Sequence, residues 1–188
     1  EFRPIGGCQD QHAGALVRYP VVSLASLGWS RQIPETADSL LGNARLKAQT
    51  VFGECSSACF ADDTGLEIEA LDGQPGVKTA RFAFEGASGQ QNREKTLLLM
   101  AGQENRRAIF RTVIVLILGG REHVFEGRVE GEITVQEFGN EGFGYDPIFR
   151  PMGCAQTYAE MPLENRARIS HRALAIVQLR HFLDGLRA

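Results

Sequence analysis

Apolar residues recur at two different spacings along the chain, and each spacing predicts a type of element. Over residues 38–52, around 92–101 and from about 163 to 186, they return every three or four positions, which predicts amphipathic helices. We place the N-cap of the first helix at Thr36, because a Thr hydroxyl can accept a hydrogen bond from a first-turn amide. The expected core residues are Leu97, Leu98 and Met100 in the second helix and Leu174, Val177, Phe182 and Leu186 in the last.

Alternation of apolar and polar residues at every second position predicts strands. They are expected over residues 21–24, 57–61, 66–70, 107–118 and 123–135. A turn over residues 62–65 would separate two of them, and Gly119 with Gly120 would join the two longest as a β-hairpin. The irregular mixture of helices and strands predicts an α/β fold with a mixed sheet, in a single domain of 188 residues.

Composition and charge exclude several classes of function. The net charge is −3, so the chain as a whole has no electrostatic reason to bind nucleic acid or an acidic membrane surface. The longest strongly apolar run, residues 113–118, is too short to cross a bilayer, and the first residues lack the apolar segment of a secretory signal.

The spacing of Cys8, Cys55, Cys59 and Cys154 matches neither a zinc site nor a redox pair. We therefore expect reduced thiols and a cytoplasmic location, although the spacing leaves a Cys55–Cys59 disulfide open.

Two adjacent carboxylates, Asp62 and Asp63, lie at the end of an expected strand. Carboxylate oxygens suit Mg²⁺, which also binds substrate phosphates, and a carboxylate beside the metal can deprotonate an attacking water. The same two residues are also compatible with a solvated acidic turn. Lys47, four residues after Asn43 on the apolar side of its helix, has two interpretations: its stem covers apolar surface, or its ammonium points into a polar cleft.

Two further segments carry groups that suit a nucleotide. In the loop over residues 141–147, glycines flank Phe143, so that a flat base can approach and stack on the ring; the alternative is a ring packed in the core. Near the end of the chain, a basic and polar cluster suits phosphate or a purine carbonyl, and is equally typical of a solvated helix face. Its members are Arg166, Arg168, Ser170, His171 and Arg172.

Six short segments follow one another in a characteristic order. They are Pro-Glu-Thr at 34–36, Asn-Ala-Arg-Leu-Lys-Ala at 43–48, Ala-Asp-Asp-Thr-Gly-Leu at 61–66, Pro-Gly-Val-Lys-Thr-Ala-Arg at 75–81, Gly-Phe-Gly-Tyr-Asp-Pro at 142–147 and Arg-Ile-Ser-His-Arg at 168–172. In this order they closely resemble the inosine triphosphate pyrophosphatase family, over about residues 33–183. The resemblance implies a long mixed sheet with two lobes around a central cleft. It also implies a homodimer that uses Mg²⁺ to hydrolyse ITP, dITP and XTP to the monophosphate and pyrophosphate.

The resemblance further implies roles for individual residues. Asp63 would activate the attacking water, and the metal would be held by Glu35, Asp62 and Asp63. The implied substrate-binding residues are Lys47, Asn43, Thr64, Phe143, Asp146, Arg166, Ser170, His171 and Arg172. Among them, Lys47 would bind the triphosphate, Phe143 would stack on the purine and Arg172 would donate to the 6-keto oxygen. Such a donor disfavours adenine, whose 6-amino group is itself a donor.

The beginning of the chain departs from the family pattern. The family has a Thr/Ser-x-Asn-x-x-Lys loop there, whereas residues 6–12 contain neither the Asn nor the Lys. Gly42 also stands where the family usually has Glu, and a Gly inside a helix costs about 1 kcal/mol relative to Ala. The alternative function is therefore a purine-nucleotide-binding paralogue whose catalysis is weakened or lost.

Overall fold

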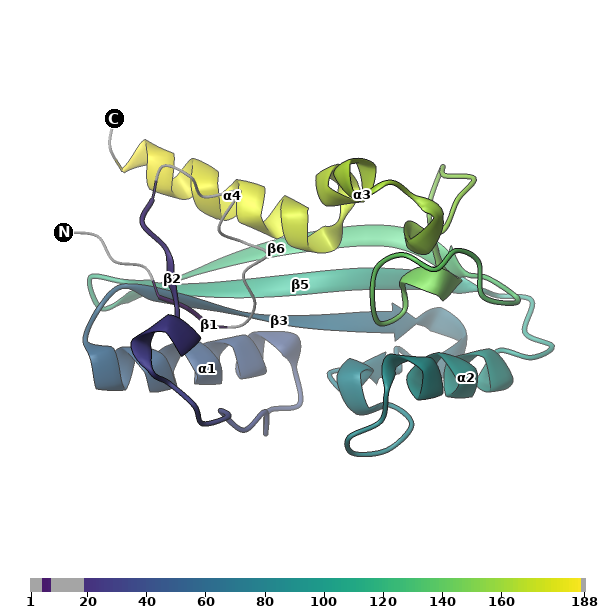
Figure 1. Ribbon diagram of the computed structural model, residues 1–188, viewed down its shortest axis with the longest axis horizontal. Helices are drawn as coiled ribbons and strands as arrows, with labels where there is room; N and C mark the ends of the chain where they lie inside the picture. The colour runs from purple at the N-terminus through teal and green to yellow at the C-terminus, as the bar shows by residue number, and fades with distance from the viewer. Residues whose placement is uncertain (1–4, 8–18, 187–188) are drawn as a thin grey trace. The chain divides into compact units, whose positions relative to one another are not determined.

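The computed structural model of the chain describes residues 5–7 and 19–186, and these form two compact units (Figure 1). The first unit comprises the described parts of Glu1–Asp63, Thr112–Gly127 and Leu174–Ala188, and the second comprises Thr64–Arg111 and Arg128–Ala173. The two lobes implied by the resemblance correspond to these units.

Seven strands form one mixed sheet, with the order β2-β1-β3-β5-β6-β7 and with β4 paired to β3. They are β1 (Ile5–Gly7), β2 (Val22–Ser23), β3 (Cys59–Ile68), β4 (Pro75–Gly76), β5 (Arg107–Leu118), β6 (Arg121–Ile133) and β7 (Phe149–Pro151). β1 is parallel to both β2 and β3, whereas β4 is antiparallel to β3 and β7 is antiparallel to β6. The expected mixed sheet is confirmed, as is the expected pair of long strands on either side of Gly119 and Gly120.

Four α-helices accompany the sheet in the described part of the chain. They are α1 (Leu40–Cys55), α2 (Gly89–Leu99), α3 (Leu163–Ile169) and α4 (His171–Gly185). Short 3-10 helices lie at Ala25–Leu27, Glu69–Leu71, Thr79–Arg81, Asp146–Ile148 and Tyr158–Glu160. Among the helices that the structure describes, none is long and apolar enough to cross a membrane.

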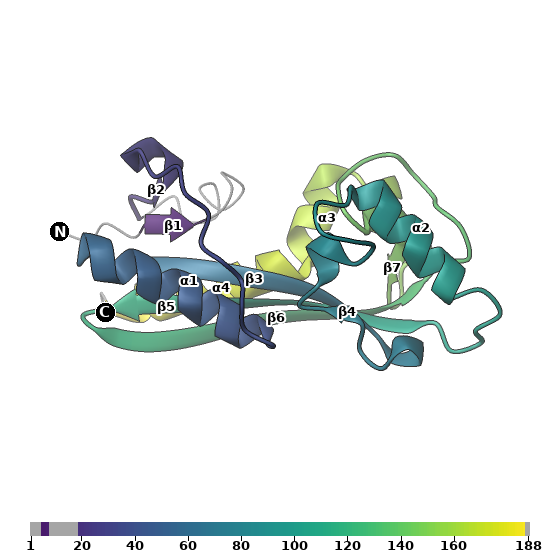
Figure 2. The ribbon, with the colours of Figure 1, turned by 90° about the horizontal axis from the view of Figure 1, so that it is seen from below.

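In the first unit, α1 and α4 cover opposite faces of the sheet (Figures 1 and 2). One hydrophobic cluster joins β3 and β5 to α4 through Phe60, Ile114, Leu116, Ala175, Ile176, Leu179 and Leu183. Successive strand side chains point to opposite faces, so Cys59 belongs to the other face. There its thiol donates to the Ala48 carbonyl of α1 at 3.4 Å.

In the second unit, Phe110 of β5 lies at the centre of an aromatic core. Its ring packs edge-on against Phe149, with 4.7 Å between ring centroids, and against His171, with 4.6 Å. Tyr145 and Tyr158 belong to the same buried cluster. Because Tyr145 follows Phe143 by two residues, this core holds the end of the loop that carries Phe143.

The turn expected over residues 62–65 is wrong, because β3 continues through these positions as one strand. The sequence suggested a turn because Asp, Thr and Gly are common there, but pairing with neighbouring strands overrides that local preference. The consequence concerns the site directly. In a continuous strand, Asp62 and Asp63 point to opposite faces of the sheet, and only Asp63 shares the face of Cys59.

Several helix boundaries also differ from the expectation. The N-cap of α1 is Ser39, whose hydroxyl accepts from the Gly42 amide at 3.1 Å, and not Thr36. α2 starts earlier than expected because its N-cap Ser88 forms a capping box with Gln91 of the first turn.

The single last helix expected over residues 163–186 is wrong, because Ser170 adopts an extended conformation that separates α3 from α4. The expected core positions are partly wrong as well: Leu98, Leu174, Val177 and Leu186 are exposed, and α4 buries Ala175, Ile176, Leu179 and Leu183 instead. The break changes the phase of α4 relative to a continuous helix, so a single 3.6-residue period could not place its buried face.

The three cysteines in the described residues, Cys55, Cys59 and Cys154, are free thiols. Burial raises the pKa of the Cys59 thiol to about 11. A buried thiol with such a pKa is unreactive at neutral pH. Cys8 lies outside the described residues. Most of the divergent segment at 6–12 lies outside them as well, but its first two residues belong to β1, which pairs with β3.

Candidate functional site

Lys47 is the centre of a polar group in the first unit, which we call the Lys47 group: Glu35, Asn43, Lys47 and Asp63. The Lys47 Nζ lies 2.9 Å from Asp63 Oδ1 and 3.1 Å from Glu35 Oε1, and its side chain is only 16% exposed. Of the two interpretations of this Lys, the structure supports the one in which the ammonium points at polar groups.

The Asp63 carboxylate is buried and held by two donors. Besides Lys47, the Asn43 side-chain amide donates to Asp63 Oδ2 at 3.3 Å. Burial raises the pKa of Asp63; Lys47 and Asn43 oppose this effect, and the nearby Glu35 carboxylate adds to it. A carboxylate that has a raised pKa and a fixed orientation is suited to accept a proton from water.

Asn43 was expected to bind substrate, and the structure shows its amide bonded within the protein on both sides. Its Oδ1 accepts from the Ala37 backbone amide at 2.9 Å, its Nδ2 donates to Asp63, and the residue is fully buried. Asn43 therefore connects Asp63 to the segment that carries Glu35.

Asp62 is buried but lies on the opposite face of β3 from the Lys47 group. That face also carries Phe60 and Thr64. The expected turn, from which both carboxylates could have faced the same side, is absent because β3 is continuous here.

The Lys47 group offers a partial set of metal ligands. Within residues 5–7 and 19–186, no three His, Cys, Asp or Glu side chains are arranged to hold a metal ion. Two carboxylates do converge on one cationic group, the Lys47 ammonium. Mg²⁺ in nucleotide enzymes often takes only one or two protein carboxylates and completes its shell with phosphate and water. Glu35 and Asp63 therefore fit a Mg²⁺ ion whose remaining ligands come from the substrate.

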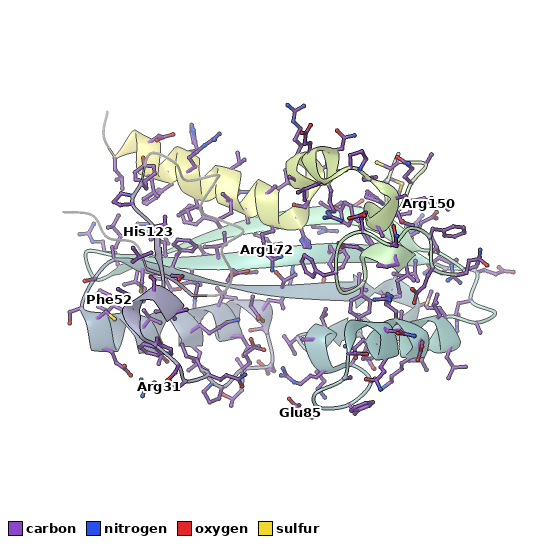
Figure 3. All side chains as sticks on the ribbon, viewed as in Figure 1. Arg31, Phe52, Glu85, His123, Arg150 and Arg172 are labelled. Carbon is purple, nitrogen blue, oxygen red and sulfur yellow. The ribbon has the colours of Figure 1, made fainter. Side chains whose placement is uncertain are left out.

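A second group of predicted residues lies together in the second unit, and we call it the Phe143 group: Thr64, Phe143, Asp146, Arg166 and Arg172. The Phe143 ring is 54% exposed, so the alternative of a ring packed in the core is wrong; Tyr145, two residues later, is the one that is buried. The Arg172 guanidinium carbon lies 5.9 Å from the centre of the Phe143 ring, and its Nη2 is 3.4 Å from Thr64 Oγ1. Figure 3 labels Arg172, near the start of α4. A ring and a guanidinium arranged in this way suit a flat, carbonyl-bearing ligand.

Asp146 fixes the loop of the Phe143 group. Its Oδ2 accepts from the Phe143 backbone amide at 3.1 Å and lies 3.5 Å from Arg166 Nη1. Burial raises the pKa of Asp146, and the Phe143 amide, Arg166, Arg172 and Arg93 oppose the rise. Gly142 has a φ of +80°, and a Cβ there would lie 2.2 Å from Asp146 Oδ2, so this close approach requires glycine.

Ser170 and His171 make structural contacts in this conformation. The Ser170 hydroxyl accepts from the Ala173 amide at 3.2 Å at the start of α4, and the buried His171 ring packs on Phe110. Their roles toward a substrate stay predictions.

Arg93 of α2 was not among the residues predicted from the sequence. Its Nη1 donates to the Gly144 carbonyl at 2.8 Å, while its Nε and Nη2 donate to the two Glu137 carboxylate oxygens at 2.9 and 3.1 Å. Arg93 thus anchors the loop beside Phe143. No local pattern could have revealed it, because its partners lie 44 and 51 residues further along the chain.

Comparison with known proteins agrees with this arrangement. The sequence profile of the Ham1 family matches residues 10–182. A dITP/XTP pyrophosphatase from Porphyromonas gingivalis is 50% identical over 164 residues, which cover 87% of this chain and 84% of that protein. One from Christiangramia forsetii is 42% identical over 184 residues, covering 98% and 94%.

Solved structures agree as well. The Ham1 protein of Staphylococcus aureus has a TM-score of 0.90 at 34% identity and covers 97% of this chain and 98% of its own. A HAM1 protein from Coxiella burnetii has a TM-score of 0.91 at 29% identity, with coverage of 98% and 100%. The chain therefore belongs to the Ham1 family.

Proposed function

We propose that this chain hydrolyses non-standard purine nucleoside triphosphates, namely dITP, XTP and ITP, to the monophosphate and pyrophosphate. Its relatives with 42% and 50% identity are dITP/XTP pyrophosphatases. The observation that carries the proposal is the largely buried Lys47 ammonium between Glu35 and Asp63, which places a phosphate-binding cation beside a carboxylate base.

In this proposal, the Lys47 group acts on the triphosphate. Asp63 accepts the proton of the attacking water, and Lys47 offsets the negative charge of the phosphates. Glu35 and Asp63 would hold Mg²⁺, which when bound neutralises phosphate charge and withdraws electrons from the leaving group. Asp62 is left out of this ligand pair because it faces the other side of β3.

The Phe143 group recognises the base in this proposal. Phe143 offers an exposed ring for stacking, and Arg172 is the donor for the 6-keto oxygen of hypoxanthine or xanthine. Adenine would place an amino donor against the guanidinium. That mismatch leaves two donors without an acceptor and disfavours ATP.

We further propose a cytoplasmic homodimer. The free cysteines of the described residues are compatible with a reducing compartment, and the family resemblance implies the dimer. Light scattering of the purified chain at several concentrations checks the assembly; a mass that stays at one chain would contradict it.

A substrate panel tests the proposed function. The purified chain is given XTP, dITP, ITP, ATP and GTP with Mg²⁺, and pyrophosphate and orthophosphate are measured separately. We expect pyrophosphate from the first three and at least about a hundredfold lower kcat/KM for ATP. Calorimetric binding of ITP without turnover would instead support the alternative, a nucleotide-binding paralogue without catalysis.

A further inference from the structure

The first turn of α1 ties together the two carboxylates that flank Lys47. The Asn43 side-chain Oδ1 accepts from the Ala37 backbone amide, and its Nδ2 donates to Asp63 Oδ2. Ala37 follows Glu35 by two residues in the chain. The buried Asn43 is thus a direct link between Asp63 and the segment that carries Glu35.

These contacts close a ring of interactions. Lys47 Nζ contacts Glu35 Oε1 and Asp63 Oδ1. The second Asp63 oxygen, Oδ2, accepts from the Asn43 amide nitrogen, and the Asn43 oxygen accepts from the Ala37 backbone amide. Each Asp63 oxygen therefore has its own donor. Two donors on different sides fix both the position of a carboxylate and the plane of its two oxygens.

Gly42 provides an independent sign that the same turn is built to hold residue 37. A Cβ at position 42 would lie 2.6 Å from the Ala37 Cβ and 3.0 Å from Ser39 Oγ. A glycine within a helix is unfavourable by about 1 kcal/mol relative to Ala. The close approach of the Ala37 segment explains why this helix nevertheless contains one.

We propose that Asn43 is a positioning residue and that Gly42 and Asn43 together form a clamp that fixes Glu35 and Asp63 relative to each other. The inference rests on the proposed function, because it assigns Asp63 as the base. In it, Asn43 does not contact the nucleotide. It sets the direction of the Asp63 carboxylate and holds the Glu35 segment against the first turn of α1.

The chain contains a closely matched control, Asn92. It is the fourth residue of α2, as Asn43 is of α1, and it is equally buried. Its Oδ1 accepts from the Ala83 amide at 2.7 Å and its Nδ2 donates to the Ala80 carbonyl at 3.0 Å. Asn92→Ala therefore removes a similar pair of hydrogen bonds, but none that involves a carboxylate of the Lys47 group.

The first experiment compares Asn43→Ala with Asn92→Ala. In Asn43→Ala we expect kcat for XTP to fall about 10- to 100-fold with KM changed less than about threefold, because the base is misplaced while Lys47 remains. In Asn92→Ala we expect kcat within about twofold of the parent chain at a comparable loss of stability in urea.

Amide hydrogen exchange supplies a readout that does not depend on activity. Exchange of the Ala37 amide, followed by NMR without nucleotide or metal, is expected to accelerate at least about tenfold in Asn43→Ala and to stay unchanged in Asn92→Ala. Asn43→Asp keeps an acceptor for the Ala37 amide but loses the donor to Asp63. It should therefore protect Ala37 from exchange without restoring kcat.

A pair of variants tests Gly42. Gly42→Ala should lower kcat because the new methyl group displaces Ala37, and Gly42→Ala combined with Ala37→Gly should restore most of it.

Equal kcat in Asn43→Ala and Asn92→Ala, or unchanged Ala37 exchange in Asn43→Ala, would overturn the clamp. A parent chain that releases no pyrophosphate would contradict the proposed function instead, and the exchange result would still decide whether the clamp exists.

Discussion

At the scale of single residues, the Lys47 ammonium keeps its charge although it is largely buried. Burial alone would lower the pKa of Lys47, but Asp63 and Glu35 outweigh it, and the net effect is a raised pKa. The ammonium therefore stays charged before any substrate arrives. A triphosphate would meet a cation that is already in position, which is the condition for electrostatic stabilisation without reorganisation.

Replacing Lys47 tests its role toward phosphate. In Lys47→Met we expect KM for XTP to rise at least about tenfold and kcat to fall, because two carboxylates then face the phosphates without a cation. Steady-state kinetics measure both. Arg45→Met is the control, since Arg45 lies on the same helix and pairs with Glu122 away from the Lys47 group; it should leave KM unchanged. An unchanged KM in Lys47→Met would contradict the assignment.

Asp146 gives a prediction about pH and stability. Its pKa is raised in the folded protein, so the folded state holds the proton more tightly than the unfolded state does. This contribution to stability is present below the ordinary carboxyl pKa and is lost as the pH rises through the raised value. In Asp146→Asn the amide oxygen still accepts from the Phe143 backbone but does not titrate.

Urea unfolding of the two proteins at several values between about pH 4 and pH 7 measures the effect. The free energy of unfolding of the parent chain, minus that of Asp146→Asn, should decrease as the pH rises across this window. A difference that stays constant or increases would show that the Asp146 pKa is not raised.

At the scale of elements, the site depends on features that interrupt regular patterns. Ser170 separates α3 from α4 and caps the second of them, so that Arg172 lies in the first turn of a new helix. The loop with Phe143 is tied to α2 by Arg93 and to its own continuation by Asp146. The Arg93 contact joins residues 51 apart in the sequence, so local propensity alone does not set the conformation of the loop.

Arg93→Gln tests whether this tie matters for base recognition. We expect KM for XTP to rise several-fold while kcat changes less than about threefold, because the loop loses its anchor while the Lys47 group is intact. Arg128→Gln is a matched control, since Arg128 lies in the same unit with an exposed pair to Glu130. If both variants bind XTP as tightly as the parent chain does, Arg93 has no positioning role.

Some of these elements could be read from the sequence and some could not. The long strands on either side of Gly119 and the helix that carries Lys47 follow strong periodic patterns, and both are confirmed. The continuity of β3 through Asp62–Gly65 could not be read, because strand pairing with distant segments overrides the local preference of Asp and Gly for turns.

At the scale of the whole molecule, residues far apart in the sequence gather into two groups, one in each compact unit. The Lys47 group combines residues from the segment before α1, from α1 and from β3. The Phe143 group combines residues from β3, from the loop over residues 141–147 and from α3 and α4. Motif resemblance named every member of both groups as a candidate site residue. It could not give the internal roles of Asn43 and Arg93, since those depend on hydrogen bonds between distant segments.

The assignment of Asp63 as the base that activates water is tested most directly by comparing it with its neighbour Asp62. Asp62→Asn and Asp63→Asn are nearly isosteric changes at consecutive positions of β3. Asp63 contacts Lys47, whereas Asp62 points to the opposite face of the strand. Pyrophosphate release from XTP with Mg²⁺ is measured for both. We expect a loss of kcat of at least about a hundredfold in Asp63→Asn and a loss at least about tenfold smaller in Asp62→Asn. Equal losses, or the larger loss in Asp62→Asn, would contradict Asp63 as the base that activates water.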